Sequence, residues 1–138
     1  MVGMDTTTQG DGPMRIKRSV ALLAAAAGVT LGMATPASAY ACQTGYFCFY
    51  YNSNQAGARF MTDSNIPNLA GETFSTIANG EGEPVKNNAA SVQNASSYCY
   101  RVYYNSNYSG PSDTVVAYSS RNLANTYNDN ASVRSMIC

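Results

Sequence analysis

Two stretches of the chain have nearly the same sequence: YYNSNQAG at residues 50–57 and YYNSNYSG at residues 103–110. Each follows an aromatic-rich run, GYFCFY at 45–50 and YCYRVY at 98–103. In both runs the residues alternate in the way that is typical of a half-buried strand. The Asn and Gly that follow favour a turn, because Gly adopts positive φ freely and Asn bonds its own backbone. The sequence therefore predicts a strand and a tight turn, made twice.

A second pair of matching segments lies downstream, NNAASV at 87–92 and NDNASV at 128–133. The first pair is offset by 53 positions and the second by 41, so the first copy carries 12 more residues, around 71–84. Matching pairs in the same order indicate a tandem duplication. We place repeat one at about 42–97 and repeat two at about 98–138.

The remaining segments complete an all-β pattern. Further strands are expected at 58–62, 91–95, 114–118 and 132–137, with short helical turns or loops at 65–69 and 121–124. No segment shows a sustained apolar stripe at helical spacing. We expect two four-stranded Greek-key units packed face to face as a small β-sandwich.

The N-terminus carries the three parts of a secretory signal peptide. A basic cluster comes first: Arg15, Lys17 and Arg18. The apolar run at 20–31 follows, and Ala-Ser-Ala at 37–39 is a pattern that signal peptidase accepts, so cleavage is predicted before Tyr40. Twelve apolar residues are too few to cross a hydrocarbon core of about 30 Å as a helix. We expect a secreted protein with no membrane association after cleavage.

Cleavage divides the chain into a leader, residues 1–39, and a domain of 99 residues, 40–138. Met14 directly precedes the basic cluster, so it is an alternative start of the leader.

Composition excludes several classes of function. The chain has 8 basic and 8 acidic residues, of which the predicted domain keeps five basic and six acidic ones. A nearly neutral domain lacks the basic face that nucleic-acid binding requires. The chain has no histidine, which excludes Ser-His-Asp and Cys-His hydrolases and His-based zinc proteases. We therefore expect a protein that is not an enzyme.

All four cysteines lie in the exported part: Cys42, Cys48, Cys99 and Cys138. In an oxidising compartment two disulfides are expected, and three pairings are possible. We favour a local Cys42–Cys48 bond, with Cys99–Cys138 joining the second half of the domain to its last residue.

The repeated aromatic strand, turn glycine and Asn/Asp-Asn/Asp-x-x-Ser segment resemble the βγ-crystallin double Greek key. Together with the leader and the opening Cys42-x-x-Gly45-x-x-Cys48, the chain resembles small secreted actinobacterial peptidase inhibitors, whose founder is the Streptomyces metalloproteinase inhibitor. The resemblance covers residues 42–138. It implies a stoichiometric inhibitor, expected to be monomeric, that places an exposed loop in the cleft of an extracellular protease, with metalloproteases favoured.

The family pattern puts the reactive bond in a short disulfide-closed loop of the second repeat. The corresponding stretch is about 109–116, SGPSDTVV, which contains no cysteine pair. The resemblance then assigns the inhibitory loop to Asp113, Thr114 and Val115, with Val115 offering the apolar side chain. The alternative is that residues 114–116 form a strand, because they are β-branched.

The resemblance also implies calcium ligands in the Asn/Asp-rich segments. The matching residues are Asn87, Asn88 and Ser91 in repeat one, and Asn128, Asp129 and Ser132 in repeat two. Since only Asp129 brings a formal charge, any affinity is expected to be weak, near the millimolar end. The alternative is that these side chains cap the turns by bonding to the backbone. No other cofactor is expected.

Two further functions remain open: a calcium-responsive structural or stress module, and a crystallin-like secreted toxin against fungi.

Overall fold

Both copies of the duplicated stretch fold into the predicted β-hairpin. The computed structural model describes residues 40–138, so the predicted leader, its signal peptide and the alternative start at Met14 lie outside the described residues. The two hairpins consist of β1 (Phe47–Asn52) with β2 (Ala56–Thr62), and β4 (Cys99–Asn105) with β5 (Ser109–Val115). Both are antiparallel, and the register shifts at the same point of each copy, after Tyr50 and after Tyr103.

A buried serine from the second matching segment holds each hairpin turn. The Ser91 hydroxyl donates to the Asn52 carbonyl at 2.6 Å and accepts from the Gln55 amide at 2.8 Å. In repeat two the Ser132 hydroxyl donates to Asn105 at 2.6 Å and accepts from Tyr108 at 3.0 Å. The two short segments of each repeat are therefore parts of one folding unit.

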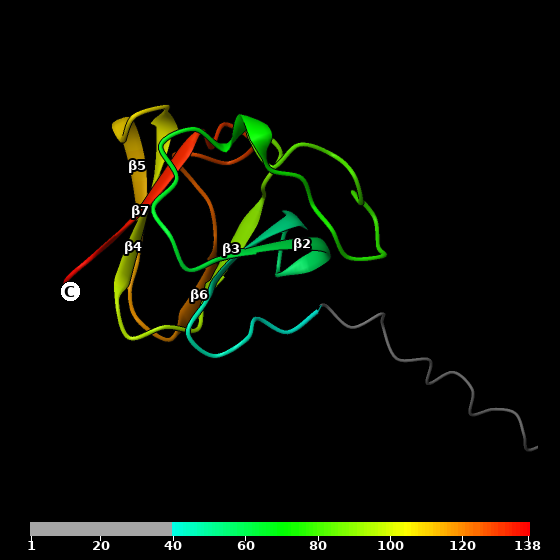
Figure 1. Ribbon diagram of the computed structural model, residues 1–138, viewed down its shortest axis with the longest axis horizontal. Helices are drawn as coiled ribbons and strands as arrows, with labels where there is room; N and C mark the ends of the chain where they lie inside the picture. Colours follow the sequence, from blue (N-terminus) through cyan, green and yellow to red (C-terminus); the bar gives the residue numbers. More distant parts are fainter. Residues whose placement is uncertain (1–39) are drawn as a thin grey trace, which may run out of the picture. The chain divides into compact units, whose positions relative to one another are not determined.

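The strands form two sheets (Figure 1). One sheet has the order β2-β1-β3-β6, with β3 at Ser91–Asn94 and β6 at Ser119–Asn122, and the other has the order β5-β4-β7, with β7 at Ser132–Met136. A short 3-10 helix, η4 (Leu69–Gly71), follows β2. This confirms the all-β prediction of two sheets.

The exchange between the repeats is the main difference from the predicted units. β6 belongs to repeat two but pairs with β3 of repeat one, where a loop or helical turn was predicted around residues 121–124. In the other direction, Ile66 of repeat one bridges Val133 in β7. Each repeat therefore supplies a segment to the sheet of the other, and the two sheets have four and three strands rather than four each.

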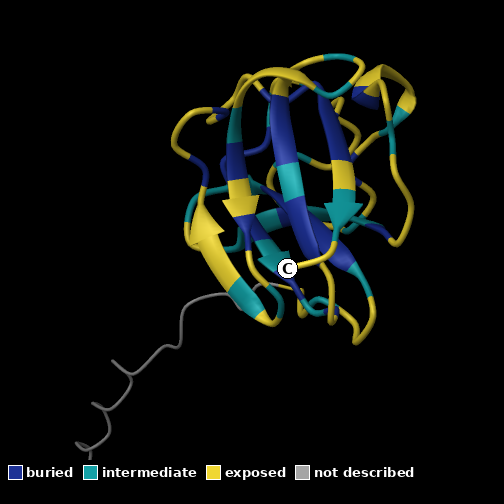
Figure 2. Ribbon diagram, turned by 90° about the vertical axis from the view of Figure 1, so that its left-hand side faces the viewer, coloured by how far each residue is buried: buried dark blue, intermediate teal, exposed yellow. Residues whose placement is uncertain are grey.

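The core lies between the sheets, where β1, β3 and β4 are mainly buried, and Figure 2 shows most of the connecting loops exposed. Phe47 stacks on Tyr100 across the sandwich, with ring centroids 4.5 Å apart. The prediction of a half-buried β1 is wrong, because Cys48 and Tyr50 on its outer face are also fully buried. Residues 40–46 lie over that face, and the Tyr50 hydroxyl donates to the Tyr40 carbonyl at 2.6 Å.

The favoured pairing of the cysteines is confirmed. Cys42 bonds Cys48 and Cys99 bonds Cys138, which leaves no free cysteine in residues 40–138. Among the described residues, no helix has the length and apolar character needed to cross a membrane.

Candidate inhibitory site

The residues assigned to the inhibitory loop lie in β5. Asp113 is 2% exposed and Val115 is 1% exposed, and only Thr114 between them faces solvent. The assignment of an exposed loop to these residues is therefore wrong, and the strand alternative is the one observed. Val115 belongs to the hydrophobic core, so it could enter a protease pocket only if β5 left the sheet.

Asp113 instead stabilises the turn that follows β6. Its carboxylate accepts from the Ala124 amide at 3.1 Å, the Thr126 amide at 2.9 Å and the Thr126 hydroxyl at 2.7 Å, and Arg121 lies 3.4 Å away. Burial alone would raise the pKa of Asp113, but these hydrogen bonds outweigh it and lower the pKa below its usual value. Asp113 is thus a charged structural residue.

The 12-residue excess of repeat one forms a loop that is closed at its base. The Val85 amide donates to Glu72 at 2.9 Å, the Phe74 amide to Glu83 at 3.0 Å and the Gly82 amide to Phe74 at 2.8 Å. We call residues 72–85 the insertion loop. Figure 1 shows it in green, extending away from the sandwich beside β2.

The far part of the insertion loop runs along β2, which is the edge strand of its sheet. The Ser75 amide donates to the Arg59 carbonyl at 3.1 Å, and the Arg59 amide donates to the Thr76 hydroxyl at 2.7 Å. The Ala58 amide donates to the Asn79 carbonyl at 2.8 Å. Because the edge of a sheet offers unpaired backbone groups, these contacts both cover the edge and fix residues 75–79.

Ile77 lies at the centre of this fixed segment and is 80% exposed. Its carbonyl accepts from the Tyr40 hydroxyl at 3.0 Å. On the inner side of the loop, Phe74 is buried and meets the Tyr51 ring edge-on at 5.6 Å. The segment therefore presents an apolar side chain on a backbone that is already ordered.

Sequence reasoning located the insertion but assigned it no role. The available signal was an isoleucine in a segment of turn-forming and acidic residues, with no matching segment in repeat two. Its exposure depends on how the loop packs against β2, which is a contact between segments distant in the sequence.

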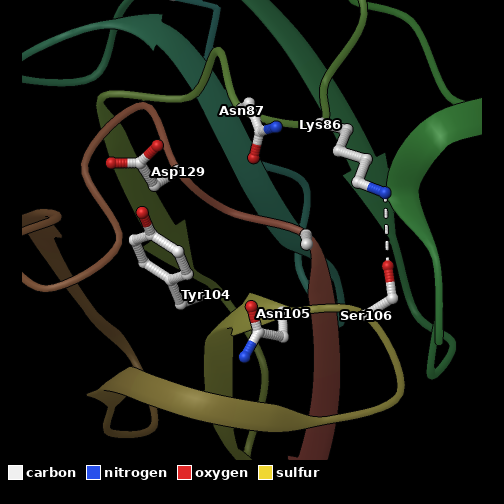
Figure 3. Close-up of a pocket in the computed structure, with 7 residues that line it drawn as sticks. Lys86, Asn87, Tyr104, Asn105, Ser106 and Asp129 are labelled. Atoms are coloured by element: carbon white, nitrogen blue, oxygen red, sulfur yellow. Dashed lines mark hydrogen bonds between the residues drawn. The ribbon is translucent and has the colours of Figure 1, made fainter.

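The predicted calcium ligands separate into two groups. Ser91 and Ser132 are fully buried and hold the hairpin turns, and the Asn88 amide group donates to the Pro84 carbonyl at 2.9 Å. Asn87 and Asp129 line a polar hollow of about 300 Å³ (Figure 3). Asn128 adopts a positive φ of 55° at the turn before Asp129.

Lys86 lines the same hollow, where its ammonium donates to Asn68 at 3.1 Å and to Ser106 at 3.2 Å. Within residues 40–138, no group of three or more His, Cys, Asp or Glu residues could hold a metal ion. One carboxylate beside an ammonium group fits a calcium ion poorly, since calcium prefers several oxygen ligands with negative charge. Calcium binding stays a prediction of the resemblance.

Comparison with known proteins gives a family and a fold. The sequence model of peptidase inhibitor family I36 matches residues 35–115, which is more than half of the chain. No curated protein matches the sequence.

Several solved structures share the fold. One structure, which concerns the evolution of the eye-lens βγ-crystallin domain fold, aligns with a TM-score of 0.54 at 10% identity. The alignment covers 75% of this chain and 95% of that chain. A βγ-crystallin from Ciona intestinalis aligns with a TM-score of 0.52 at 14% identity, covering 67% of this chain and 100% of that chain. The N-terminal domain of protein S aligns with a TM-score of 0.50 at 18% identity, covering 67% of this chain and 96% of that chain.

Proposed function

Because the chain belongs to peptidase inhibitor family I36, we propose that it is a secreted, monomeric inhibitor of metalloproteases that binds the protease cleft through residues 75–79. Family membership makes the protein a peptidase inhibitor, which is not an enzyme and whose partner is a protease. The observation that supports the loop is the hydrogen bonding of residues 75–79 to the edge strand β2.

A fixed loop favours inhibition for an energetic reason. Binding a flexible segment costs conformational entropy for each residue that becomes ordered, whereas a segment that is already ordered loses little. Residues 75–79 are held at both ends by backbone hydrogen bonds to Arg59 and Ala58. Phe74 in the core prevents the loop from swinging away from the sandwich.

The metalloprotease target and the secretion of the protein are supported by the sequence. The target follows from the resemblance to the Streptomyces metalloproteinase inhibitor, and secretion follows from the signal-like residues 1–39. Two disulfides are consistent with an oxidising compartment.

The proposal is tested by titrating thermolysin with purified residues 40–138, which form a unit with their own core. We expect activity to fall linearly with added protein and to reach zero near one equivalent. Subtilisin and trypsin serve as the comparison proteases. No loss of thermolysin activity at a large molar excess contradicts the metalloprotease target, and inhibition of subtilisin alone would move the target to serine proteases.

A further inference from the structure

We infer that Ile77 is the residue that enters a specificity pocket of the protease, and that the acidic residues of the same loop favour a protease with an aliphatic pocket and a basic rim. This inference rests on the proposed function, and it names the contact residue and the chemistry of the partner.

The first support is the position of Ile77. An exposed isoleucine on a mobile segment would be unremarkable, because single apolar residues are common on protein surfaces. Here the side chain is 80% exposed, while the backbone on both sides is bonded to β2 and the Ile77 carbonyl is bonded to Tyr40. A fixed, protruding apolar side chain is what an apolar pocket in a partner can bury at little entropic cost.

The second support is the charge of the insertion loop. Of the six acidic residues in 40–138, three lie in this loop: Glu72, Glu81 and Glu83. The only ion pair among the described residues joins Arg121 to Asp113, so the three glutamates are not neutralised by a paired cation. The nearby Arg59 guanidinium donates to the Ala41 carbonyl and lies over the Tyr40 ring.

The three glutamates outnumber the nearby Arg59, and an excess of charge of one sign beside a contact residue steers partners of the opposite sign and raises their rate of association. A protease whose cleft is bordered by Lys or Arg would therefore associate fastest. A protease with an acidic rim would be repelled even if its pocket accepted isoleucine.

The third support is a chain of hydrogen bonds from the core to the loop. The buried Tyr50 hydroxyl donates to the Tyr40 carbonyl, and the Tyr40 hydroxyl donates to the Ile77 carbonyl. Tyr40 is therefore a positioning residue: it does not enter the pocket, but it sets the direction in which Ile77 points.

The chain offers a matched control for Ile77. Ile137 is 89% exposed, lies next to the last residue and is distant from the insertion loop in sequence. Ile77→Ser and Ile137→Ser remove the same apolar surface from two exposed positions. The inhibition constant of each variant is measured against the protease that the parent inhibits best, and melting temperatures verify that both variants fold.

We expect Ile77→Ser to weaken inhibition by at least about 30-fold, as truncation of an interface hot spot does, and Ile137→Ser to change it by less than about twofold. Tyr40→Phe keeps the ring but removes the donor to Ile77, so we expect a loss of several-fold with an unchanged melting temperature. Equal inhibition by the two serine variants overturns the role of Ile77 while leaving the inhibitor function intact. A parent that inhibits no protease overturns the proposed function together with this inference.

The charge preference is measured separately. Replacing Glu72, Glu81 and Glu83 together by Gln should lower the association rate about tenfold at low salt and much less at high salt, because salt screens exposed charges. Asp63→Asn removes an exposed carboxylate outside the insertion loop and is the control, which should leave the rate nearly unchanged. If the triple Gln variant associates at the same rate as the parent and with the same salt dependence, the inferred basic rim of the protease is wrong.

Discussion

Asp113 is the one buried acidic side chain among residues 40–138, and its contacts explain why a charge is tolerated there. Its carboxylate receives two backbone amides, a hydroxyl and the partly exposed guanidinium of Arg121. A buried carboxylate is costly unless such partners replace water. Residue 113 therefore contributes to stability only while it is ionised.

We expect this contribution to depend on pH. Because the folded protein lowers the pKa of Asp113, its stabilising effect is fully present above the pKa of the unfolded chain, about 4, and is lost as the pH falls through the lower folded pKa. Asp113→Asn should lower the free energy of unfolding at pH 7 by about 1–3 kcal/mol and flatten the loss of stability in acid. Urea unfolding at pH 7 and pH 3 measures both effects.

The exposed Asp129 provides the control for this measurement. Asp129→Asn removes the same charge without removing a buried hydrogen-bond acceptor, so the free energy of unfolding should change by less than about 0.5 kcal/mol at pH 7. If Asp113→Asn follows the parent at both pH values, the carboxylate of residue 113 does not stabilise the turn at residues 124–126.

The insertion loop is ordered by one close approach in addition to its hydrogen bonds. Gly80 has a φ of 97°, and the space that a Cβ would occupy there is filled by the Tyr51 ring. Gly82 has a similar φ of 83° but open space around the same position. The two glycines thus have similar backbone conformations but differ in their surroundings.

Substituting each glycine by Ala therefore tests whether contact with the Tyr51 ring holds the insertion loop in place. Gly82→Ala should cost about 1 kcal/mol, because a side chain disfavours positive φ. Gly80→Ala should cost that amount plus about 1–3 kcal/mol for displacing the Tyr51 ring, and it should weaken inhibition because it moves residues 75–79. Thermal unfolding and protease titration of both variants measure these effects. Equal melting temperatures would mean that the Tyr51 ring does not hold the loop.

The hairpins could be predicted from sequence because their determinants are local. The aromatic alternation, the turn residues and the later serine all lie within one repeat, and Gly57 and Gly110 have positive φ values of 82° and 84°. The polar β6, SSRN, has no such signal: it is a strand because β3 offers it a partner. Strand exchange between the repeats was missed for the same reason.

The candidate site was predicted least well, because it depends on which side chains remain outside the fold. Val115 and Ile77 are both aliphatic residues that directly follow a threonine in the sequence. Val115 alternates with Thr114 along a strand and points into the core, whereas Ile77 lies in a loop that turns it outward. The β-branched run at 114–116 favours a strand for Val115, but the exposure of Ile77 follows only from the packing of the insertion loop against β2.

The two disulfides make different contributions to the whole molecule, and their removal should separate stability from inhibition. Cys99–Cys138 spans 39 positions and Cys42–Cys48 only 6, so loop entropy predicts losses of about 4 and about 2 kcal/mol on replacing each pair by Ala. The short disulfide lies in the segment that carries Tyr40, and Tyr40 holds Ile77. The less destabilised double variant, Cys42→Ala with Cys48→Ala, should therefore lose more inhibition at a temperature where both variants are folded. Urea unfolding and protease titration of the two double variants measure this, and a larger loss of inhibition in the Cys99/Cys138 variant would place the inhibitory contact near the C-terminus instead.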